Sequence, residues 1–339
     1  MACKQSPQPL SLTFLDELII PDSTFVNGTL IGGLSGIDYQ NGRYVIVSDD
    51  SKAPRYYDVS INIVSDSLGG ITFNSVTKLS DTSHYYDLES ILVESDKLIL
   101  SSEGHIRSAK DPSIFRYDSQ AHTYDFFALP TYFKANGEQR PRTNGVFEGL
   151  ARSADGKGYW TITELPLEKD GMAPTFDKAD SPVRMTYFDK KNRRPIKQFV
   201  YELDRVAKEP KEAFAVNGVT DLLALDDDRL LVIERSYSSG QGADSNDIKL
   251  YEVSIKKATN TLEFEQLMDS SYTPMTKKLI FDFNSVRTEL TKNTIDNVEG
   301  LCYGPVLENG KSSLLLIVDN DFNSQGNRLN QLLLMQINE

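Results

Sequence analysis

The chain has 339 residues, of which 39% are hydrophobic and 10% aromatic, so it can bury a large core as a globular protein. Its formal net charge is −13, which argues against nucleic acid or an anionic membrane surface as a partner. The same acidity suits a protein that binds cations or is exported.

Residues 1–9 are expected to form a flexible tether ahead of one domain over residues 10–339. The polar, proline-containing stretch after Cys3 is similar to the mature start of a bacterial lipoprotein. It predicts a lipid on Cys3, with the protein in the periplasm or on the outer membrane or cell surface; an incidental cysteine in a disordered tail is the alternative. No apolar run approaches the roughly 18 residues of a membrane span. Cys302 is expected to be a small core residue.

Strand-like runs rich in β-branched and aromatic residues then follow one another, separated by turn signals. After an N-terminal strand, Leu10–Ile20, they form five similar units. In chain order the predicted strands are Leu34–Tyr39, Arg43–Ser48, Arg55–Ile61 and Ile71–Leu79; Leu88–Val93, Lys97–Ser102, Ser113–Tyr117 and Tyr124–Leu129; Phe147–Arg152, Gly158–Thr163, Val183–Phe188 and Lys197–Leu203; Val219–Leu225, Arg229–Ile233, Ile248–Ile255 and either Leu262–Leu267 or Lys278–Phe283; and Val298–Tyr303, Ser312–Val318 and Asn330–Ile337.

The fifth unit lacks an outer strand, whereas the N-terminal strand has no unit of its own. A β-propeller solves both problems, because the N-terminal strand can complete the last blade and remove the free edges. The sequence therefore predicts an all-β propeller of five four-stranded blades, closed by Leu10–Ile20. Six blades are the alternative if residues 262–283 contain an atypical blade. A short helix over Asp204–Ala215 is the one helical candidate.

Carboxylates recur at fixed places in these units. The first strand of each unit carries a polar residue near its start, and the second strand ends in an acid. The first-strand positions are Ser35, Glu89, Glu148, Thr220 and Glu299, and the second-strand acids are Asp49, Glu103, Glu164, Glu234 and Asp319. The intervals Ser35 to Asp49, Glu89 to Glu103 and Thr220 to Glu234 are all 14 residues. In a propeller, equivalent positions form rings around the axis, so we expect these acids to converge.

Carboxylates that face one channel repel one another, so either protons or cations must neutralise them. Oxygen ligands without nearby Cys or His select hard cations, with Ca²⁺ the first choice and Mg²⁺ the second. The predicted ligands are Asp49, Glu89, Glu103, Glu148, Glu164, Glu234, Glu299 and Asp319. The alternative is structural: the acids pair with arginines or accept backbone N–H bonds.

Four arginines are placed near the same end of the units: Arg55, Arg107, Arg184 and Arg235. Guanidinium groups beside a bound cation could hold a phosphate or carboxylate, because arginine offers bidentate donors. They are the predicted substrate-binding residues. Among the three histidines, His105 follows Glu103 at the acidic end, although a core or surface role is the alternative.

Several motifs in order resemble the phytase-like family of bacterial proteins, described as having esterase-like activity of phytase. They are Leu34–Tyr39 with Val47–Asp50, Phe147–Ala151, Thr220–Leu225 with Leu231–Tyr237, and Val298–Leu301 with Val318–Phe322. The resemblance implies a β-propeller, usually exported, with a phosphoesterase-type activity.

Two functions follow from these patterns. The first is a metal-dependent hydrolase of phosphoric esters that acts on a small anionic substrate, with Glu148 and Glu299 as catalytic carboxylates. The second is a non-catalytic binding or scaffold propeller that recognises a ligand or an unknown protein partner at the cell surface, because a fold does not decide between the two. The protein is expected to be a monomer.

Overall fold

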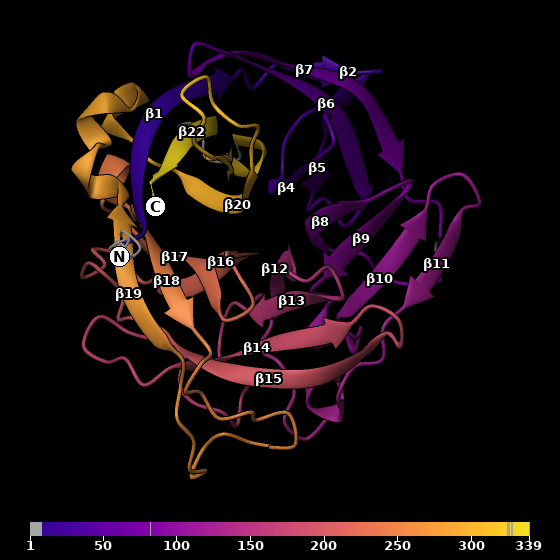
Figure 1. Cartoon of the computed structure of the whole chain (residues 1–339). Helices are drawn as coiled ribbons and strands as arrows, with labels where there is room; N and C mark the ends of the chain where they lie inside the picture. Colours follow the sequence, from indigo (N-terminus) through magenta and orange to yellow (C-terminus); the bar gives the residue numbers. More distant parts are fainter. Residues whose placement is uncertain (1–8, 82, 324–325, 327, 339) are drawn as a thin grey trace, which may run out of the picture.

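A computed structural model describes residues 9–81, 83–323, 326 and 328–338. Five four-stranded antiparallel sheets surround a central axis as the blades of a propeller, which confirms the predicted fold (Figure 1). Residues 1–8, which include Cys3, lie outside the described residues, so the predicted tether and lipid anchor stay predictions. No helix in the described part of the chain is long and apolar enough to cross a membrane.

Each blade runs from an inner strand at the axis to an outer strand at the rim. The strands are β4 (Leu34–Gln40), β5 (Arg43–Ser48), β6 (Arg55–Val64) and β7 (Ser67–Lys78) in blade 1; β8 (Leu88–Glu94), β9 (Lys97–Ser102), β10 (Ser113–Asp118) and β11 (Thr123–Phe126) in blade 2; β12 (Phe147–Arg152), β13 (Gly158–Thr163), β14 (Pro182–Asp189) and β15 (Arg194–Glu202) in blade 3; β16 (Ala215–Ala224), β17 (Arg229–Ser238), β18 (Asn246–Ser254) and β19 (Thr276–Asp282) in blade 4; and β20 (Asn297–Tyr303), β21 (Ser313–Asp319), β22 (Asn330–Asn338) and β1 (Ser11–Ile20) in blade 5.

The connections contain little regular structure. A small hairpin, β2 (Phe25–Val26) with β3 (Thr29–Leu30), precedes blade 1. Single-turn 3₁₀ helices are η1 (Ile106–Ser108), η2 (Thr131–Phe133), η3 (Gly242–Asp244), η4 (Phe283–Ser285), η5 (Arg287–Glu289), η6 (Thr291–Asn293) and η7 (Asp321–Asn323).

The N-terminal strand closes the ring as predicted. β1 pairs antiparallel with β22, from Ser11 opposite Asn338 to Ile20 opposite Asn330, and thereby supplies the outer strand of blade 5. The outer strand of blade 4 is β19, close to the second of its two candidate segments, and residues 262–267 form no strand. The described chain therefore has five blades, and the six-blade alternative is excluded.

The predicted short helix over residues 204–215 is wrong. The segment is irregular up to β16, and its backbone N–H groups bond outside the segment. The N–H of Asp204 donates to Glu234, and that of Ala207 donates to Ser236 Oγ at 2.8 Å. Because these partners replace the bonds of a helical ladder, the segment runs along blade 4 instead of coiling.

Apolar side chains fill the spaces between neighbouring blades. One such cluster joins Trp160 and Val183 of blade 3 to Val219 and Tyr251 of blade 4. Cys302 is buried in another cluster, as expected for a small core residue. These interfaces fix the angle between the sheets and so fix the positions of the inner strands.

The inner strand of every blade contains a β-bulge at the recurring polar position of that strand. This position, called the first-ring position below, holds Ser35, Glu89, Glu148, Thr220 or Glu299. The pairing register shifts between Leu34 and Gly36, Leu88 and Ile91, Phe147 and Leu150, Val219 and Asp221, and Val298 and Gly300. A bulge re-aims side chains and is typical of functional positions. Here the bulge interrupts the in-and-out alternation of the strand at the residues that the repeat singled out.

Beyond the bulges the inner strands nearly touch. A Cβ atom at Gly36 would lie 2.8 Å from the carbonyl oxygen of Glu89 in the next blade. A Cβ at Gly300 would lie 2.9 Å from Cα of Gly36. Only glycine allows backbones of three blades to approach this closely.

Candidate functional site

The first-ring position serves two purposes, according to residue type. In blades 1 and 4 it holds hydroxyls that tie inner strands together: Ser35 Oγ donates to the carbonyl of Leu88 at 2.9 Å, and Thr220 Oγ1 donates to that of Val298 at 2.8 Å. In blades 2, 3 and 5 it holds glutamates. Glu89 and Glu148 are half-buried and make no side-chain hydrogen bond in the described part of the chain. The three glutamates are the residues of this ring that can do chemistry.

The second ring, formed by the residues at the ends of the second strands, does not contain the predicted acid in blade 4. In blades 1, 2, 3 and 5 the second-strand acid lies opposite the residue two positions before the first-ring residue. The pairs are Asp49 with Gly33, Glu103 with Asp87, Glu164 with Val146, and Asp319 with Asn297. In blade 4 that residue, Gly218, lies opposite Arg235, whereas Glu234 lies opposite Val219. The hairpin between β16 and β17 has one extra residue, so an equal interval in sequence does not mean an equivalent place.

Glu234 accordingly lies outside the ring and has a structural role. Its carboxylate accepts bonds from Tyr201, from Asn217 Nδ2 at 2.7 Å and from Lys277 Nζ at 2.6 Å. Its side chain is only 3% exposed. The structure thus does not bring Glu234 together with the other predicted ligands, and we remove it from the candidate set.

Arg235 takes the place of the missing acid and neutralises two others. Its guanidinium bonds Glu164 at 2.9 Å and Glu299 at 2.6 Å, and it also contacts Asn297, which itself bonds Glu299. Because desolvated ion pairs of this kind are costly to break, Arg235 and its partners form a fixed unit. Arg235 is therefore part of the ring, where it holds carboxylates of the protein.

The acid ring consists of seven predicted carboxylates and one that the sequence reasoning missed. The members are Asp49, Asp87, Glu89, Glu103, Glu148, Glu164, Glu299 and Asp319. Burial raises the pKa of every member, and neighbouring carboxylates add to the effect at Glu89, Glu148, Asp49 and Glu103. Eight carboxylates facing one guanidinium leave a large excess of negative charge unless protons or cations are bound.

The sizes of these pKa shifts show which carboxylates of the ring titrate near neutral pH. Burial and the neighbouring Asp319 raise the pKa of Asp49 to about 8, and burial with Asp87 raises that of Glu103 to about 8. Burial raises the pKa of Glu299 to about 7 although Arg235 opposes it, and that of Asp87 rises to about 6. The pKa of Glu89 is well above its ordinary value because of burial and then of the neighbouring Glu148.

The ring has a neutralised side and an unneutralised side. Arg235 compensates the carboxylates of blades 3 and 5, and Asp319 Oδ1 accepts the N–H of Leu34 at 2.8 Å. On the side of blades 1 and 2, Glu103 Oε2 accepts the N–H of Gly145 at 3.1 Å, but Asp49 and Glu89 have no side-chain hydrogen bond among the described residues. The uncompensated charge is therefore concentrated at blades 1 and 2, next to Glu148.

A hard cation fits this ring by donor type. The donors are all carboxylate oxygens, and those of Asp49, Glu89 and Glu148 are not engaged with protein hydrogen-bond donors in the described structure. In the described residues no three Asp, Glu, His or Cys side chains are spaced to hold a metal ion together. A bound cation would thus require these side chains to turn toward one another.

The other predicted arginines are distributed differently from the expectation. Arg55 is buried, with its guanidinium held by Asp50 at 2.7 Å and by Tyr57 at 2.7 Å. Arg184 is fully buried away from the ring and forms a bidentate pair with Asp170 at 2.6 and 2.8 Å. Both are structural residues in this arrangement. Arg107, in η1, is exposed and remains a candidate for binding an anion.

His105 lies beside the ring without completing it. Its backbone pairs with Lys110, its ring lies 5.6 Å from that of Tyr85, and its Nδ1 is buried without a partner among the described residues. His105 therefore completes no metal site with neighbouring side chains in the described residues.

The comparisons with known proteins identify the class of this propeller. The sequence model of the phytase-like family, described as "esterase-like activity of phytase", matches residues 29–322. The match covers blades 1–4, the two inner strands of blade 5 and the acid ring, and the chain belongs to this family. The family assignment agrees with the resemblance of the sequence motifs. No curated protein matches the sequence.

Solved structures similar to this chain have diverse activities. The catalytic domain of a GH62 α-L-arabinofuranosidase from Coprinopsis cinerea has 12% identity and a TM-score of 0.44, with 98% of each chain covered. A glutaminyl cyclase from Myxococcus xanthus has 7% identity and a TM-score of 0.42, with 98% of this chain and 99% of the other covered. Neither likeness carries information on the activity of this chain.

Proposed function

We propose that this protein binds a hard divalent cation at the acid ring, Ca²⁺ in the first place and Mg²⁺ as the alternative, and that the loaded ring hydrolyses esters of small anionic substrates. Phosphate esters are the first substrate class to test. The observation that carries the proposal is the excess of buried carboxylates over guanidinium groups at one end of the channel. Membership of the phytase-like family supports an esterase-type or phosphatase-type activity.

The proposed ligands lie on the unneutralised side of the ring. Asp49, Asp87 and Glu89 come from blades 1 and 2, and Glu148 lies between them and Arg235. A bound divalent cation would supply electrostatic stabilisation of the charge that develops on the ester oxygens. Its positive charge would also favour the ionised form of these carboxylates, whose pKa burial otherwise raises.

The two proposed catalytic carboxylates have different tasks. Glu148 makes no side-chain hydrogen bond in the described structure, and burial and then Glu164 raise its pKa, which favours a role as the carboxyl that gives and takes a proton. Glu299 is fixed by Arg235 and Asn297 and would keep that guanidinium beside the site, where its charge would offset that of a substrate anion. Arg107, exposed in η1, would give a second contact to the anion.

Cation binding is tested by thermal unfolding with EDTA, Ca²⁺ or Mg²⁺. A cation that binds only the folded state raises Tm in a concentration-dependent way. Glu89→Gln should abolish most of the rise, whereas Glu263→Gln, which changes an exposed glutamate far from the ring, should leave it unchanged. The absence of any Tm rise with both cations would contradict the proposed site.

Turnover is tested with phytate, simple phosphomonoesters and simple carboxyl esters in the presence of each cation. Glu148→Gln should lower kcat by about 10²–10⁴-fold, as expected for loss of a proton-transfer group. Cation binding without turnover of any of these substrates would instead assign the protein as a binding propeller.

A further inference from the structure

An aromatic side chain lies beside the part of the acid ring that carries the uncompensated charge. Phe322, in η7 directly after β21, is partly exposed. A Cβ atom at Gly33 would lie 2.1 Å from Asp49 Oδ1 and 2.8 Å from Cε2 of Phe322, so the phenyl ring and the Asp49 carboxylate are immediate neighbours. Because Asp49 is one of the proposed cation ligands, a molecule bound at that cation comes within reach of the phenyl ring.

A pair of glycines makes room for this phenyl ring. A Cβ atom at Gly32 would lie 2.5 Å from Cδ1 and 2.9 Å from Cε1 of Phe322, so a side chain at this position would displace the ring. The phenyl ring also contacts the guanidinium of Arg55, with 5.6 Å from Cζ to the ring centroid. Arg55 is itself buried and fixed by hydrogen bonds. These contacts fix the position of the phenyl ring beside Asp49.

The backbone that carries Phe322 is strained. Asp321, Phe322 and Asn323 all have φ of +51°, a left-handed conformation that residues other than glycine adopt at a cost and usually singly. Strain of this kind persists only where the surroundings enforce it, and it is concentrated at active sites and ligand clamps. Its occurrence next to the acid ring favours a functional role for Phe322.

Hydrogen bonds enforce the strained conformation. The Asp22 carboxylate accepts one bond from Asn320 Nδ2 at 2.8 Å and another from Asn323 Nδ2 at 2.6 Å, so it holds the loop on both sides of the phenylalanine. Asp319 Oδ2, in the acid ring, accepts the N–H of Asp321 at 2.7 Å. A surface that is fixed before a ligand arrives loses little conformational entropy on binding.

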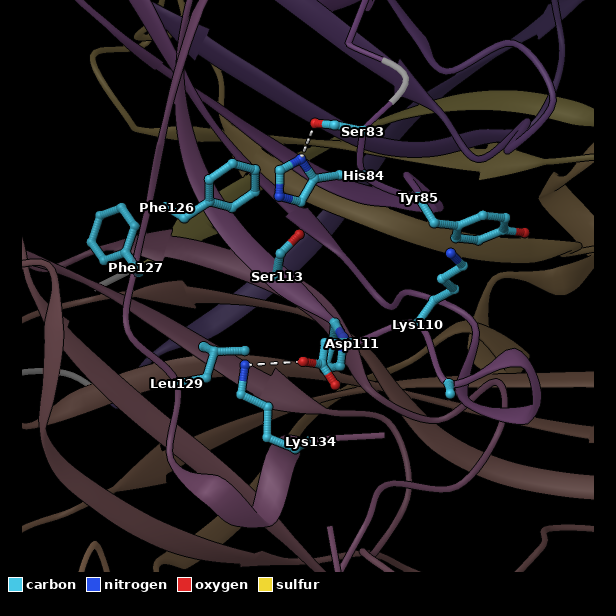
Figure 2. A pocket seen from close by; sticks show the side chains of 12 residues that line it. Ser83, His84, Tyr85, Lys110, Asp111, Ser113, Phe126, Phe127, Leu129 and Lys134 are labelled. Atoms are coloured by element: carbon cyan, nitrogen blue, oxygen red, sulfur yellow. Dashed lines mark hydrogen bonds and ion pairs between the residues drawn. The ribbon is translucent and has the colours of Figure 1, made fainter. Parts of the chain in front are cut away.

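The aromatic residues at the end of blade 2 do not have this position. They line a separate cavity of about 440 Å³, in which Phe126 stacks on His84 with 4.3 Å between ring centroids (Figure 2). In the described structure no member of the acid ring lines this cavity. Phe126 therefore offers a matched control for Phe322.

We propose that Phe322 determines the substrate class of the acid ring by packing against a flat apolar group of the ester, so that the site prefers aryl esters to esters of small alcohols. This inference rests on the proposed function, in which the cation holds the anionic end of the substrate. The phenyl ring of Phe322 then meets the carbon skeleton attached to that end. Packing of two aromatic rings adds to the gain from burying their surfaces, so an aryl group gains more than a methyl group.

The test measures binding of phenylphosphonate and methylphosphonate, which are not hydrolysed, by calorimetry in the presence of Ca²⁺ and, separately, of Mg²⁺. Phenylphosphonate should bind the unchanged protein about tenfold more tightly than methylphosphonate. Phe322→Ala and Phe322→Leu should remove this preference by weakening phenylphosphonate alone, whereas Phe322→Tyr should keep it. Phe126→Ala should keep it as well.

Three results would overturn the inference: equal affinity of the two phosphonates, an unchanged preference in both Phe322→Ala and Phe322→Leu, or no binding of either phosphonate to the cation-loaded protein. The cation-dependent Tm rise should persist in Phe322→Ala, and the Tm of each variant in EDTA reports whether its fold is intact. A normal Tm rise with equal phosphonate affinities would refute the role of Phe322 and leave the cation site standing. Absence of the Tm rise in the unchanged protein would refute the cation site itself and this inference with it.

Discussion

Two sets of carboxylates lie on the inner strands, and they differ in burial and in their supply of hydrogen-bond donors. Asp38 is held by both terminal nitrogens of Arg152 and by the N–H of Val93 at 2.6 Å. Asp221 accepts the N–H of Leu301 at 2.7 Å and that of Leu222 at 2.8 Å. These bonds join blade 1 to blades 2 and 3, and blade 4 to blade 5.

Glu89 and Glu148 of the acid ring have no such donors in the described structure. The structural acids are thus both fully buried and supplied with donors, whereas the half-buried glutamates of the ring lack such partners. A carboxylate with its lone pairs occupied stabilises the fold, and one without partners costs free energy that a proton or a cation can recover.

The largest expected effect is a loss of stability of the metal-free protein as pH rises. The ring carboxylates have folded-state pKa values raised to about 6 for Asp87, about 7 for Glu299 and about 8 for Asp49. Between the unfolded pKa and these values the folded state binds more protons, so its stability is full at low pH and is lost as pH rises from about 4 to 8.

The slope is about 1.4 kcal/mol per pH unit for each proton that the folded state holds in excess. Urea unfolding at pH 5 to 8 in EDTA measures it, and the proposed cation should flatten the slope. A free energy of unfolding that rises over this range would contradict the electrostatic description of the ring.

The second prediction concerns Asp38, the carboxylate with a full set of donors. Asp38→Asn keeps the shape but leaves the Arg152 guanidinium without its ionised partner in a largely buried place. We expect a loss of about 3 kcal/mol in the free energy of unfolding, as for breaking a buried pair. Urea denaturation at pH 7 measures it, with Glu263→Gln as the surface control. A change below about 0.5 kcal/mol would mean that the pair is not structural.

The third prediction applies the same acid-to-amide change to the ring. Glu89→Gln should stabilise the metal-free protein at pH 8 by about 1–2 kcal/mol, because it removes a buried charge that has no partner. At pH 5 the effect should be smaller, because burial and Glu148 raise the pKa of Glu89 and so favour its neutral form at lower pH. The opposite signs of Glu89→Gln and Asp38→Asn at pH 8 are the sharpest check of the comparison, and equal signs would refute it.

The smallest effect on the folded domain is expected at Cys3. Cys3→Ser should leave Tm unchanged and should shift the protein expressed in a bacterial host with its export leader from the membrane fraction to the soluble fraction. This follows from the proposed lipid on Cys3. Equal partitioning of the two forms would argue against the anchor.

Much of the architecture was predictable from the sequence, because turn signals and strand composition are local. The closure by Leu10–Ile20 followed from the missing outer strand of the last unit. The ring was found through recurring acids, and Asp87 could have been found too: it stands two residues before Glu89, as Asn297 stands before Glu299.

The errors came from contacts that spacing does not encode. One additional residue in the β16–β17 hairpin replaces Glu234 by Arg235 in the ring, and an interval counted along the chain cannot reveal where a turn absorbs a residue. The position of Arg184 at the start of a strand predicts a substrate-binding role, but the arginine is held by Asp170, which comes from the loop before that strand. Which side of a strand an arginine occupies depends on such tertiary partners.

The pairing of β1 with β22 has a consequence for how the protein is made. Ser11 leaves the ribosome more than 300 residues before its partner Asn338 exists. At about 5–20 residues per second, strand β1 waits for roughly 15–60 s as an unpaired edge while four blades form behind it. The nascent chain is thus an open ring for most of its synthesis, and a chaperone or protease that recognises exposed strands meets it during this interval.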